Sequence, residues 1–522
     1  MVLPLVTLAS LLPEGGQALA AGLHPDILRA WMETLKGMHP EDAAVALKEQ
    51  LKRTGVATSL RVRLKMLDLM AAETWRIADG FETDLNRANH PLSSALQRKV
   101  VLGNDLLKYH SKCFQAAIQK LKGGWLSRGN AKLLQRTLSS AMEMERRRLL
   151  LAFRAYAPGS KSAWRNLHKL YRIARDAGVA TQSADDGDSQ HNLYVKSILL
   201  AYAEPVQMAP GELDRIRFYL DRYAGLVELS DLSRSLIGPA AREGCFLIRN
   251  DEEGPGRSLR KWHNLQAQSN DLLLDCGPLL AKLRSQIDAI EHGALPSKIG
   301  LPTVARRPYY VSMLKHLLTL WGAPPLRRSH RQHFKPRVEI IAGLDNLWML
   351  LSGISLKRRR DDHKEAEEGE QGVDISEWSV FNESTTGFAL QYLNGETGAL
   401  SVGALAGVRA PDRSRTHICF VRRLVSGDQR SVELGLEKYA PFAVPTILSW
   451  SGSGSNQPPV RALVLPQVPS LREGAAVIVP PNILRSGKRV PFVLDGRYLT
   501  YVAGAPVERC PDYEIFSLGK PD

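Results

Sequence analysis

The sequence predicts a multidomain α + β protein: a helical N-terminal region, then an antiparallel β-barrel, then a further small β module. Two patterns indicate this class. Apolar residues recur every three to four positions over most of residues 24–322, whereas from residue 325 onward short alternating runs are separated by Gly- and Pro-rich turns. Gly322-Ala323-Pro324-Pro325 separates the two patterns. A chain of 522 residues is long enough for about two to four domains.

Start signals and one-sided apolar spacing define the helices of the N-terminal region. His24-Pro25-Asp26 places a proline and an acid in a first turn, as helix N-termini prefer, and Leu28, Trp31 and Leu35 then share one face. A polar stretch at 178–191 is a possible split in this region, which follows an N-terminal segment at 1–23. The candidate helices lie at residues 24–35, 60–77, 92–122, 130–156, 193–202, 210–223, 272–290 and 309–321.

Short runs with strand character follow. A barrel is expected at 325–445 with an insertion at about 342–376, and the C-terminal β module is expected at 446–522. The barrel strands are expected at 338–341, 378–381, 388–392, 417–423 and 431–436. The strands of the second module are expected at 461–465, 475–479, 490–494, 497–502 and 513–516.

The positive charge is concentrated in one part of the chain. The formal net charge is +15, and residues 51–200 carry 26 Lys and Arg against 12 Asp and Glu. Such a surplus favours an acidic partner such as a nucleic acid or an anionic membrane surface, although a solvated helical face has the same composition.

Cysteine usage and hydropathy bear on the compartment. The five cysteines are widely spaced and include no C-x-x-C pair, so we expect a reducing, cytoplasmic location. No apolar run is long enough to span a membrane. A secretory signal normally begins with Lys or Arg before its apolar stretch. Residues 1–12 are apolar and the first basic residue is Arg29, so a secretory signal is not expected.

Two motifs after residue 325 suit a guanine-rich anion. Arg327-Arg328-Ser329-His330-Arg331 is an R-x-x-x-R step, whose guanidinium groups can fork two hydrogen bonds onto phosphate or onto the O6/N7 edge of guanine. Asn382-Glu383-Ser384-Thr385-Thr386-Gly387 is an N-x-S-x-x-G turn. In it Asn382 and Ser384 offer donors and acceptors for base edges, and Gly387 permits a close backbone approach or a positive φ.

This pair of motifs resembles the signature of PilZ domains, the bacterial receptors for cyclic di-GMP. The resemblance covers about 120 of the 522 residues. It implies a small barrel whose entering segment carries the arginines and whose wall carries the second motif. It also implies cyclic di-GMP as the ligand, bound by Arg327, Arg328, Arg331, Asn382, Ser384 and Gly387. Arg331 and Asn382 are 51 positions apart, farther than in the family, and the insertion accounts for the excess.

Arg422 and Arg423 follow an apolar strand and therefore point to opposite faces of the barrel wall. We expect one of them to reach the ligand side, and Arg423 is the further candidate ligand residue. Asp185, Asp186 and Asp188 lack the glutamate that closes a calcium loop at EF-hand spacing, and no catalytic or metal-binding motif is present. We expect no enzyme, no cofactor and no metal.

The sequence therefore predicts a cytoplasmic signalling receptor that relays the cyclic di-GMP level to a protein partner through its helical region. The output that the resemblance implies is control of motility, pili or exopolysaccharide. Two alternatives stay open: a nucleic-acid-binding protein that uses the basic helices, and a degenerate PilZ adaptor that binds no nucleotide.

Overall fold

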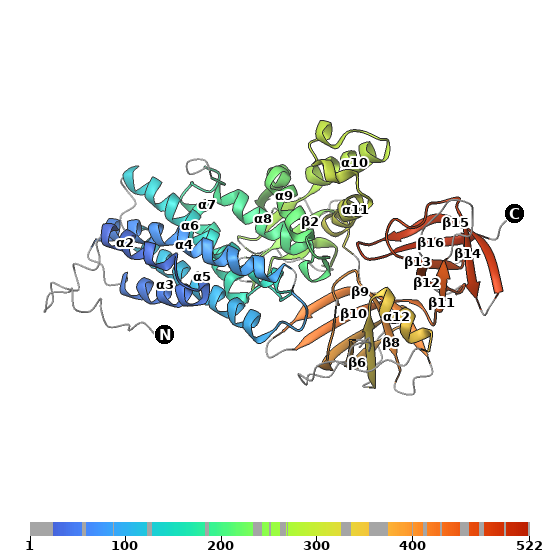
Figure 1. The fold of residues 1–522 in the computed structure, drawn as a ribbon. Helices are drawn as coiled ribbons and strands as arrows, with labels where there is room; N and C mark the ends of the chain where they lie inside the picture. Colours follow the sequence, from blue (N-terminus) through green and yellow to red (C-terminus); the bar gives the residue numbers. More distant parts are fainter. Residues whose placement is uncertain are drawn as a thin grey trace, which may run out of the picture. The chain divides into compact units, whose positions relative to one another are not determined.

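The computed structural model of the chain is shown in Figure 1. It describes residues 25–54, 59–86, 88–122, 128–182, 187–232, 243–249, 252–261, 268, 270–324, 336–353, 374–398, 400–410, 415–427, 431–448, 459–468, 474–494 and 497–519. These residues form two compact units. Unit 1 comprises residues up to 86, 94–203 and 216–279, and unit 2 comprises residues 87–93, 204–215 and 280 onward. The predicted class, a helical region followed by an antiparallel β-barrel and a further β module, is confirmed, and the module is a second closed barrel.

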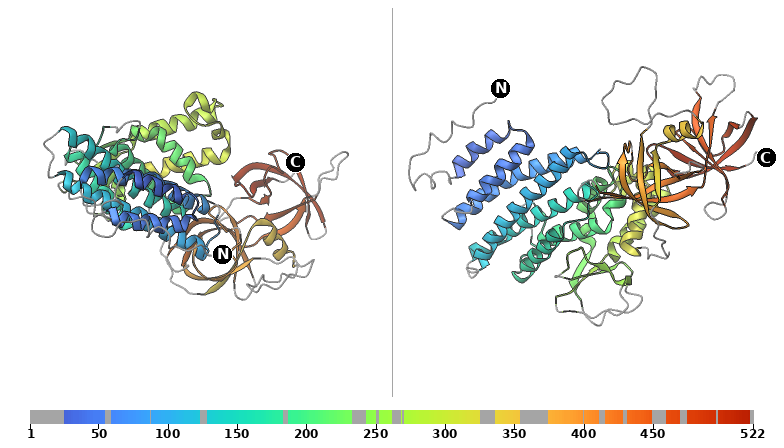
Figure 2. Two further views of the ribbon diagram at one scale, coloured as in Figure 1. Left: turned by 60° about the vertical axis from the view of Figure 1, so that its left-hand side comes forward. Right: turned by 90° about the horizontal axis from the view of Figure 1, so that it is seen from below.

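Unit 1 is built mainly of helices, which lie side by side in chain order in Figure 2. Ser59 caps the helix that begins at Leu60, because its hydroxyl accepts a hydrogen bond from the Val62 amide at 3.2 Å. The helices are α2 (Pro25–Leu35), α3 (Pro40–Thr54), α4 (Leu60–Leu85), α5 (Ser94–Lys122), α6 (Arg128–Arg154), α7 (Lys161–Asp176), α8 (Gln190–Tyr202) and α9 (Glu212–Tyr223), of which the last crosses a unit boundary. Both α7 and α8 belong to unit 1, so the polar stretch at 178–191 connects helices of one unit.

The chain of unit 1 ends in a small antiparallel sheet of order β1-β4-β2-β3. Its strands are β1 (Glu228–Asp231), β2 (Cys245–Ile248), β3 (Arg257–Ser258) and β4 (Leu272–Asp275). We expected a helix from residue 272, and this is wrong for its first turn: Leu272 and Leu274 pair with β2 as strand residues, and α10 (Gly277–Glu291) begins after them. The sheet decides this boundary because the apolar run alone suits either structure.

Unit 2 contains α11 (Pro308–Gly322) and two closed barrels. The first barrel has the strand order β10-β7-β6-β5-β8-β9, with every paired neighbour antiparallel. Its strands are β5 (Arg337–Ala342), β6 (Ile375–Glu383), β7 (Gly387–Gly395), β8 (Leu405–Arg409), β9 (Thr416–Ser426) and β10 (Val432–Ala440).

A helix occupies the first part of the expected insertion between β5 and β6. This helix, α12 (Leu344–Leu351), begins two residues after β5 ends, and residues 354–373 lie outside the described part of the chain. Gly407 on β8 makes room for it, because a side chain there would collide with Leu347 of α12. The apolar stretch that we assigned to an insertion therefore forms part of a packed core.

The second barrel has the order β11-β12-β13-β16-β15-β14. Its strands are β11 (Val444–Leu448), β12 (Val460–Leu465), β13 (Ala476–Val479), β14 (Arg489–Leu494), β15 (Arg497–Arg509) and β16 (Glu514–Gly519). The five strands expected in this module are present, and β11 is an additional strand that follows β10 after a three-residue connection.

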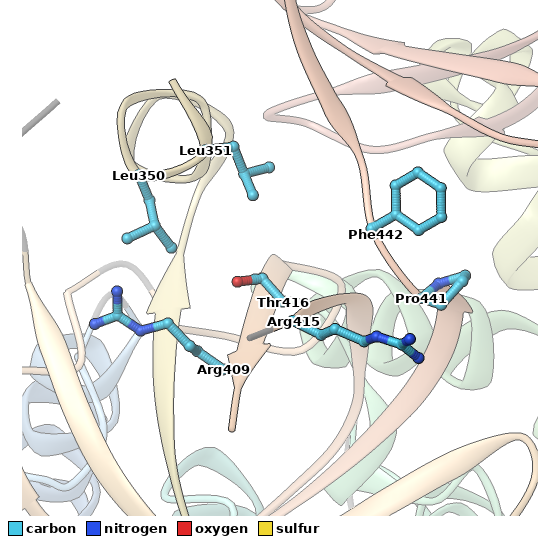
Figure 3. Close-up of a pocket in the computed structure, with 7 residues that line it drawn as sticks. All are labelled: Leu350, Leu351, Arg409, Arg415, Thr416, Pro441 and Phe442. Atoms are coloured by element: carbon cyan, nitrogen blue, oxygen red, sulfur yellow. The ribbon is translucent and has the colours of Figure 1, made fainter. Parts of the chain in front are cut away.

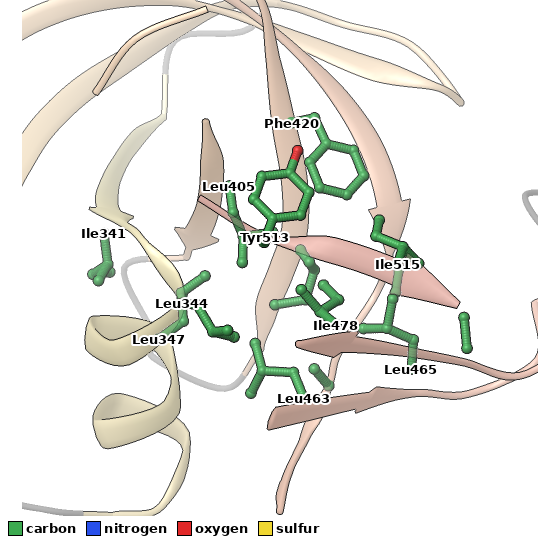
Figure 4. Packing of buried hydrophobic residues seen from close by; sticks show 14 of the residues in the cluster. Ile341, Leu344, Leu347, Leu405, Phe420, Leu463, Leu465, Ile478, Tyr513 and Ile515 are labelled. Atoms are coloured by element: carbon green, nitrogen blue, oxygen red, sulfur yellow. The ribbon is translucent and has the colours of Figure 1, made fainter. Parts of the chain in front are cut away.

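The two barrels share one apolar core, shown in Figure 4. Leu347 of α12, Phe420 of β9 and Ile478 of β13 belong to the same buried cluster. The buried Tyr513 ring stacks on Phe420, with ring centroids 5.4 Å apart, and its hydroxyl donates to the Gly403 carbonyl at 2.9 Å. Because the side chains of this cluster come from both barrels and are buried together, the two barrels pack as one body.

Candidate ligand-binding site

The topology of the first barrel places the start of β5 beside β6, the strand that leads into the second motif. β5 begins beside the middle of β6 and runs antiparallel to it, since Arg337 pairs with Ser379 and the Val380 amide donates to the Pro336 carbonyl at 2.9 Å. The arginine motif ends five positions before Pro336. Arg327, Arg328 and Arg331 themselves lie outside the described residues.

The second motif is the turn between β6 and β7. The Ser384 amide donates to the Gly387 carbonyl at 2.9 Å, which closes the turn. Thr385 and Thr386 are exposed at its tip, Ser384 is half-buried, and Asn382 is only 5% exposed. The sequence points to Asn382 and Ser384 as ligand contacts, and in this structure Ser384 is the more open of the two.

A glycine is needed at position 387 because the backbone of β10 lies very close to it. A Cβ atom at this position would lie 2.5 Å from the Leu436 carbonyl oxygen, closer than real side chains approach. The glycine therefore permits a close approach of two backbones, which is the first of the two reasons that we considered for it.

Lys438 on β10 holds the turn in place, and sequence analysis did not find it. Its ammonium group donates to the Glu383 carboxylate at 2.6 Å and to the Ser384 carbonyl at 2.9 Å. It also lies 4.2 Å from the centroid of the Phe388 ring, and its side chain is 11% exposed. A lysine on an alternating strand is usually solvated, so the sequence contained no signal for this role.

His417 on β9 completes the environment of the turn. Its ring meets Phe388 edge-on, with centroids 5.7 Å apart. Burial lowers the pKa of His417, the positive charges of Lys438 and Arg415 lower it further, and Glu383 opposes them. The imidazole is therefore neutral at pH 7 and adds no positive charge beside the turn.

Arg422 and Arg423 have different surroundings. Arg422 donates to Glu437 at 2.6 Å and to Glu508 of the second barrel at 2.8 Å, so it acts as a structural tie between the barrels. Arg423 is exposed. A row of register partners connects it to the second motif.

In this row Arg423 pairs with Gly435 on β10, Gly435 with Ala389 on β7, and Ala389 with Asn382 on β6. The two residues between Asn382 and Arg423 are thus the small Ala389 and Gly435. The row gives Arg423 a place on the same barrel wall as the second motif.

The basic helices of unit 1 hold several of their charges in internal ion pairs. Arg146 and Arg147 both donate to Glu143 at 2.7 Å. Arg148, with a side chain 1% exposed, pairs with the buried Glu145 at 2.5 Å. These arginines stabilise the helix packing, but because their acidic partners belong to the same region, the ion pairs leave its net surplus of positive charge unchanged.

The described residues contain no group of His, Cys, Asp and Glu side chains with metal-site geometry. Within the same residues, no helix combines the length and the apolar character that crossing a membrane requires.

A helical region followed by a small barrel with an N-x-S-x-x-G turn is consistent with a PilZ-type receptor, and two comparisons show similarity to a cyclic-di-GMP receptor. Residues 26–235 match the family model described as the N-terminal domain of the cyclic-di-GMP receptor FimW. The chain is also similar to the cyclic-di-GMP receptor FimW of Pseudomonas aeruginosa, with 22% identity over an alignment of 549 positions that covers 90% of this chain and 86% of the relative. No solved structure matches.

Proposed function

We propose that this protein is a cyclic di-GMP receptor that binds the nucleotide at the rim of its first barrel. The observation that carries the proposal is the position of the N-x-S-x-x-G turn, at the barrel end where the chain enters from the arginine motif. The similarity to a relative that is named as a receptor for this nucleotide supports it over nine-tenths of the chain.

The chemistry assigns a role to each group. Arg327, Arg328 and Arg331 clamp the phosphates and the guanine O6/N7 edges, while Ser384 and Asn382 complete base recognition. Arg423 adds a further cation on the same wall. Hydrogen bonds to charged groups contribute about 1.5–3 kcal/mol each, so three arginines are sufficient for micromolar binding.

The nucleotide level is then relayed to a protein partner that controls motility, pili or exopolysaccharide. The arginine motif lies between α11, the helix that precedes the first barrel, and β5, the first strand of that barrel. Binding orders this connection and changes the presentation of the helical region, which is the contact surface for the partner. The protein works in the cytoplasm as a binding protein, with no cofactor and no catalysed reaction.

Isothermal titration of the full-length protein with cyclic di-GMP tests this function. We expect saturable binding that is lost in Arg327→Ala and Arg331→Ala and kept in Arg485→Ala, an exposed arginine of the second barrel. GMP serves as the ligand control, since it lacks the second base and the cyclic backbone. Binding that is unchanged in both motif variants contradicts the assignment.

Two further outcomes point to the alternatives. If the folded wild-type protein does not bind cyclic di-GMP, the barrel is an adaptor without a nucleotide. If the protein retards DNA at low salt, and the retardation weakens steeply as salt is raised, the basic helices bind nucleic acid.

A further inference from the structure

A cavity of about 540 Å³ lies in unit 2, and the residues that line it do not include those of the N-x-S-x-x-G turn. Four elements meet around it. α12 contributes Leu350 and Leu351, β8 contributes Arg409, the start of β9 contributes Arg415 and Thr416, and the connection between β10 and β11 contributes Pro441 and Phe442. Its volume falls in the range of about 300–1,000 Å³ that is typical of small-molecule sites.

One side of the cavity is apolar. Figure 3 shows the two leucines of α12 across the cavity from Pro441 and Phe442. Phe442 is 48% exposed although it is a large aromatic residue. An aromatic or aliphatic body placed between Phe442 and the leucines would remove this apolar surface from water, which is favourable.

The other side of the cavity is positively charged. Arg409 is held in place by Glu339 on β5, to which its Nε donates at 2.7 Å, so the charge of Arg409 is largely matched. Arg415 is exposed, and in Figure 3 its guanidinium group lies on the side of Pro441 and Phe442. Among the described residues, no carboxylate forms an ion pair with Arg415. The described lining therefore carries about one unmatched positive charge next to an apolar wall.

We propose that this cavity binds a small molecule that carries one anionic group on an aromatic or aliphatic body. The anionic group pairs with Arg415, and the body packs between Phe442 and the two leucines. We take this site to be separate from the proposed cyclic di-GMP site, because none of the described candidate residues Asn382, Ser384 and Gly387 lines it. It lies against the three-residue connection between the two barrels, so its occupant contacts the junction of both.

A fluorescence titration with 8-anilinonaphthalene-1-sulfonate, an aromatic monoanion, tests the proposal on the full-length protein. We expect one saturable site, from which decanoate displaces the dye and decylamine, the cation of the same chain length, does not. Arg415→Gln and Phe442→Ser each weaken dye and decanoate binding by about tenfold, as expected for the loss of one charged contact or of one aromatic wall. Both side chains are largely exposed, so neither substitution removes a core contact.

Arg485→Gln is the matched control, because Arg485 is an exposed arginine of unit 2 that does not line the cavity, and it keeps the wild-type affinity. Dye binding that persists at saturating cyclic di-GMP supports a separate site. The proposal is overturned if no saturable site is found, if both cavity variants bind like wild type, if decylamine displaces the dye as well as decanoate does, or if cyclic di-GMP competes fully for the same site. Its failure leaves the arginine-motif titrations unaffected.

Discussion

The ammonium group of Lys438 donates to the carbonyl oxygen of Ser384 at 2.9 Å, and this contact ties β10 to the turn between β6 and β7. The same ammonium group neutralises Glu383, the acid within the motif. A turn that presents ligand-binding groups has to be held by its neighbours, because a mobile turn would lose conformational entropy on binding. Lys438 therefore acts through Ser384 as a positioning residue.

Replacement of Lys438 by Met should weaken cyclic di-GMP binding about tenfold, because one charge-assisted contact to the turn is lost. Titration calorimetry measures the affinity. Lys438→Arg keeps the charge and should restore part of the binding, which a purely steric role would not predict. Lys488→Met, at an exposed position of the second barrel, is the control. Equal affinities for Lys438→Met and wild type would remove the positioning role.

Replacement of Gly387 by Ala should destabilise unit 2 by about 1–3 kcal/mol, because the new methyl group overpacks against the Leu436 carbonyl. The β7–β10 pairing opens locally and nucleotide binding falls with it. Urea unfolding measures the change. Gly80→Ala in α4 is the matched control, since no atom lies within 4 Å of the added methyl group, and it should be neutral or slightly stabilising. A Gly387→Ala protein as stable as wild type would contradict the close approach.

The shared core predicts that the two barrels unfold together. Tyr513 is 1% exposed, stacks on Phe420 and donates to Gly403, so Tyr513→Ala should cost about 3–5 kcal/mol and lower the transition of both barrels. Differential scanning calorimetry, combined with hydrogen exchange of amides in each barrel, detects this. Val507→Ala, at a position 53% exposed, should change little. Loss of exchange protection in the second barrel alone would show that the barrels are energetically separate.

Unit 1 should lose stability as the pH falls from about 6.5 toward 3, in part through His110. Burial lowers the pKa of His110 from 6.5 to about 3. Nδ1 contacts the Thr74 hydroxyl at 2.9 Å and Nε2 contacts the Leu67 carbonyl at 3.1 Å, which suits the neutral ring. Between these pH values the unfolded chain binds a proton at His110 that the folded chain does not bind. The free energy of unfolding therefore decreases as the pH is lowered.

The contribution of His110 is at most about 1.4 kcal/mol per pH unit. Urea unfolding at a series of pH values, on wild type and His110→Gln, isolates it as a difference in slope. His110→Gln is less stable at pH 7 but should depend less on pH below 6. Parallel curves for the two proteins would show that His110 does not contribute to the dependence.

Much of the fold could be predicted because strands with clear alternation leave a local signal. Residues 417–423 and 388–392 were placed in strands for this reason, and they lie within β9 and β7. β8 and β11 were missed. β8 contains Gly407 and β11 contains Pro445. Gly and Pro are unfavourable inside strands, so neither segment has a clear local strand signal.

The sequence by itself determined the order of helices and barrels, and it identified the N-x-S-x-x-G turn, because periodicity and turn chemistry depend on residues close together in the chain. Only the tertiary structure decided that Lys438 fastens that turn, that Arg422 ties the two barrels while Arg423 faces solvent, and that α12 fills a core shared by both barrels. These relationships join residues from tens to more than a hundred positions apart. Each depends on strand register and burial, which local sequence patterns do not encode.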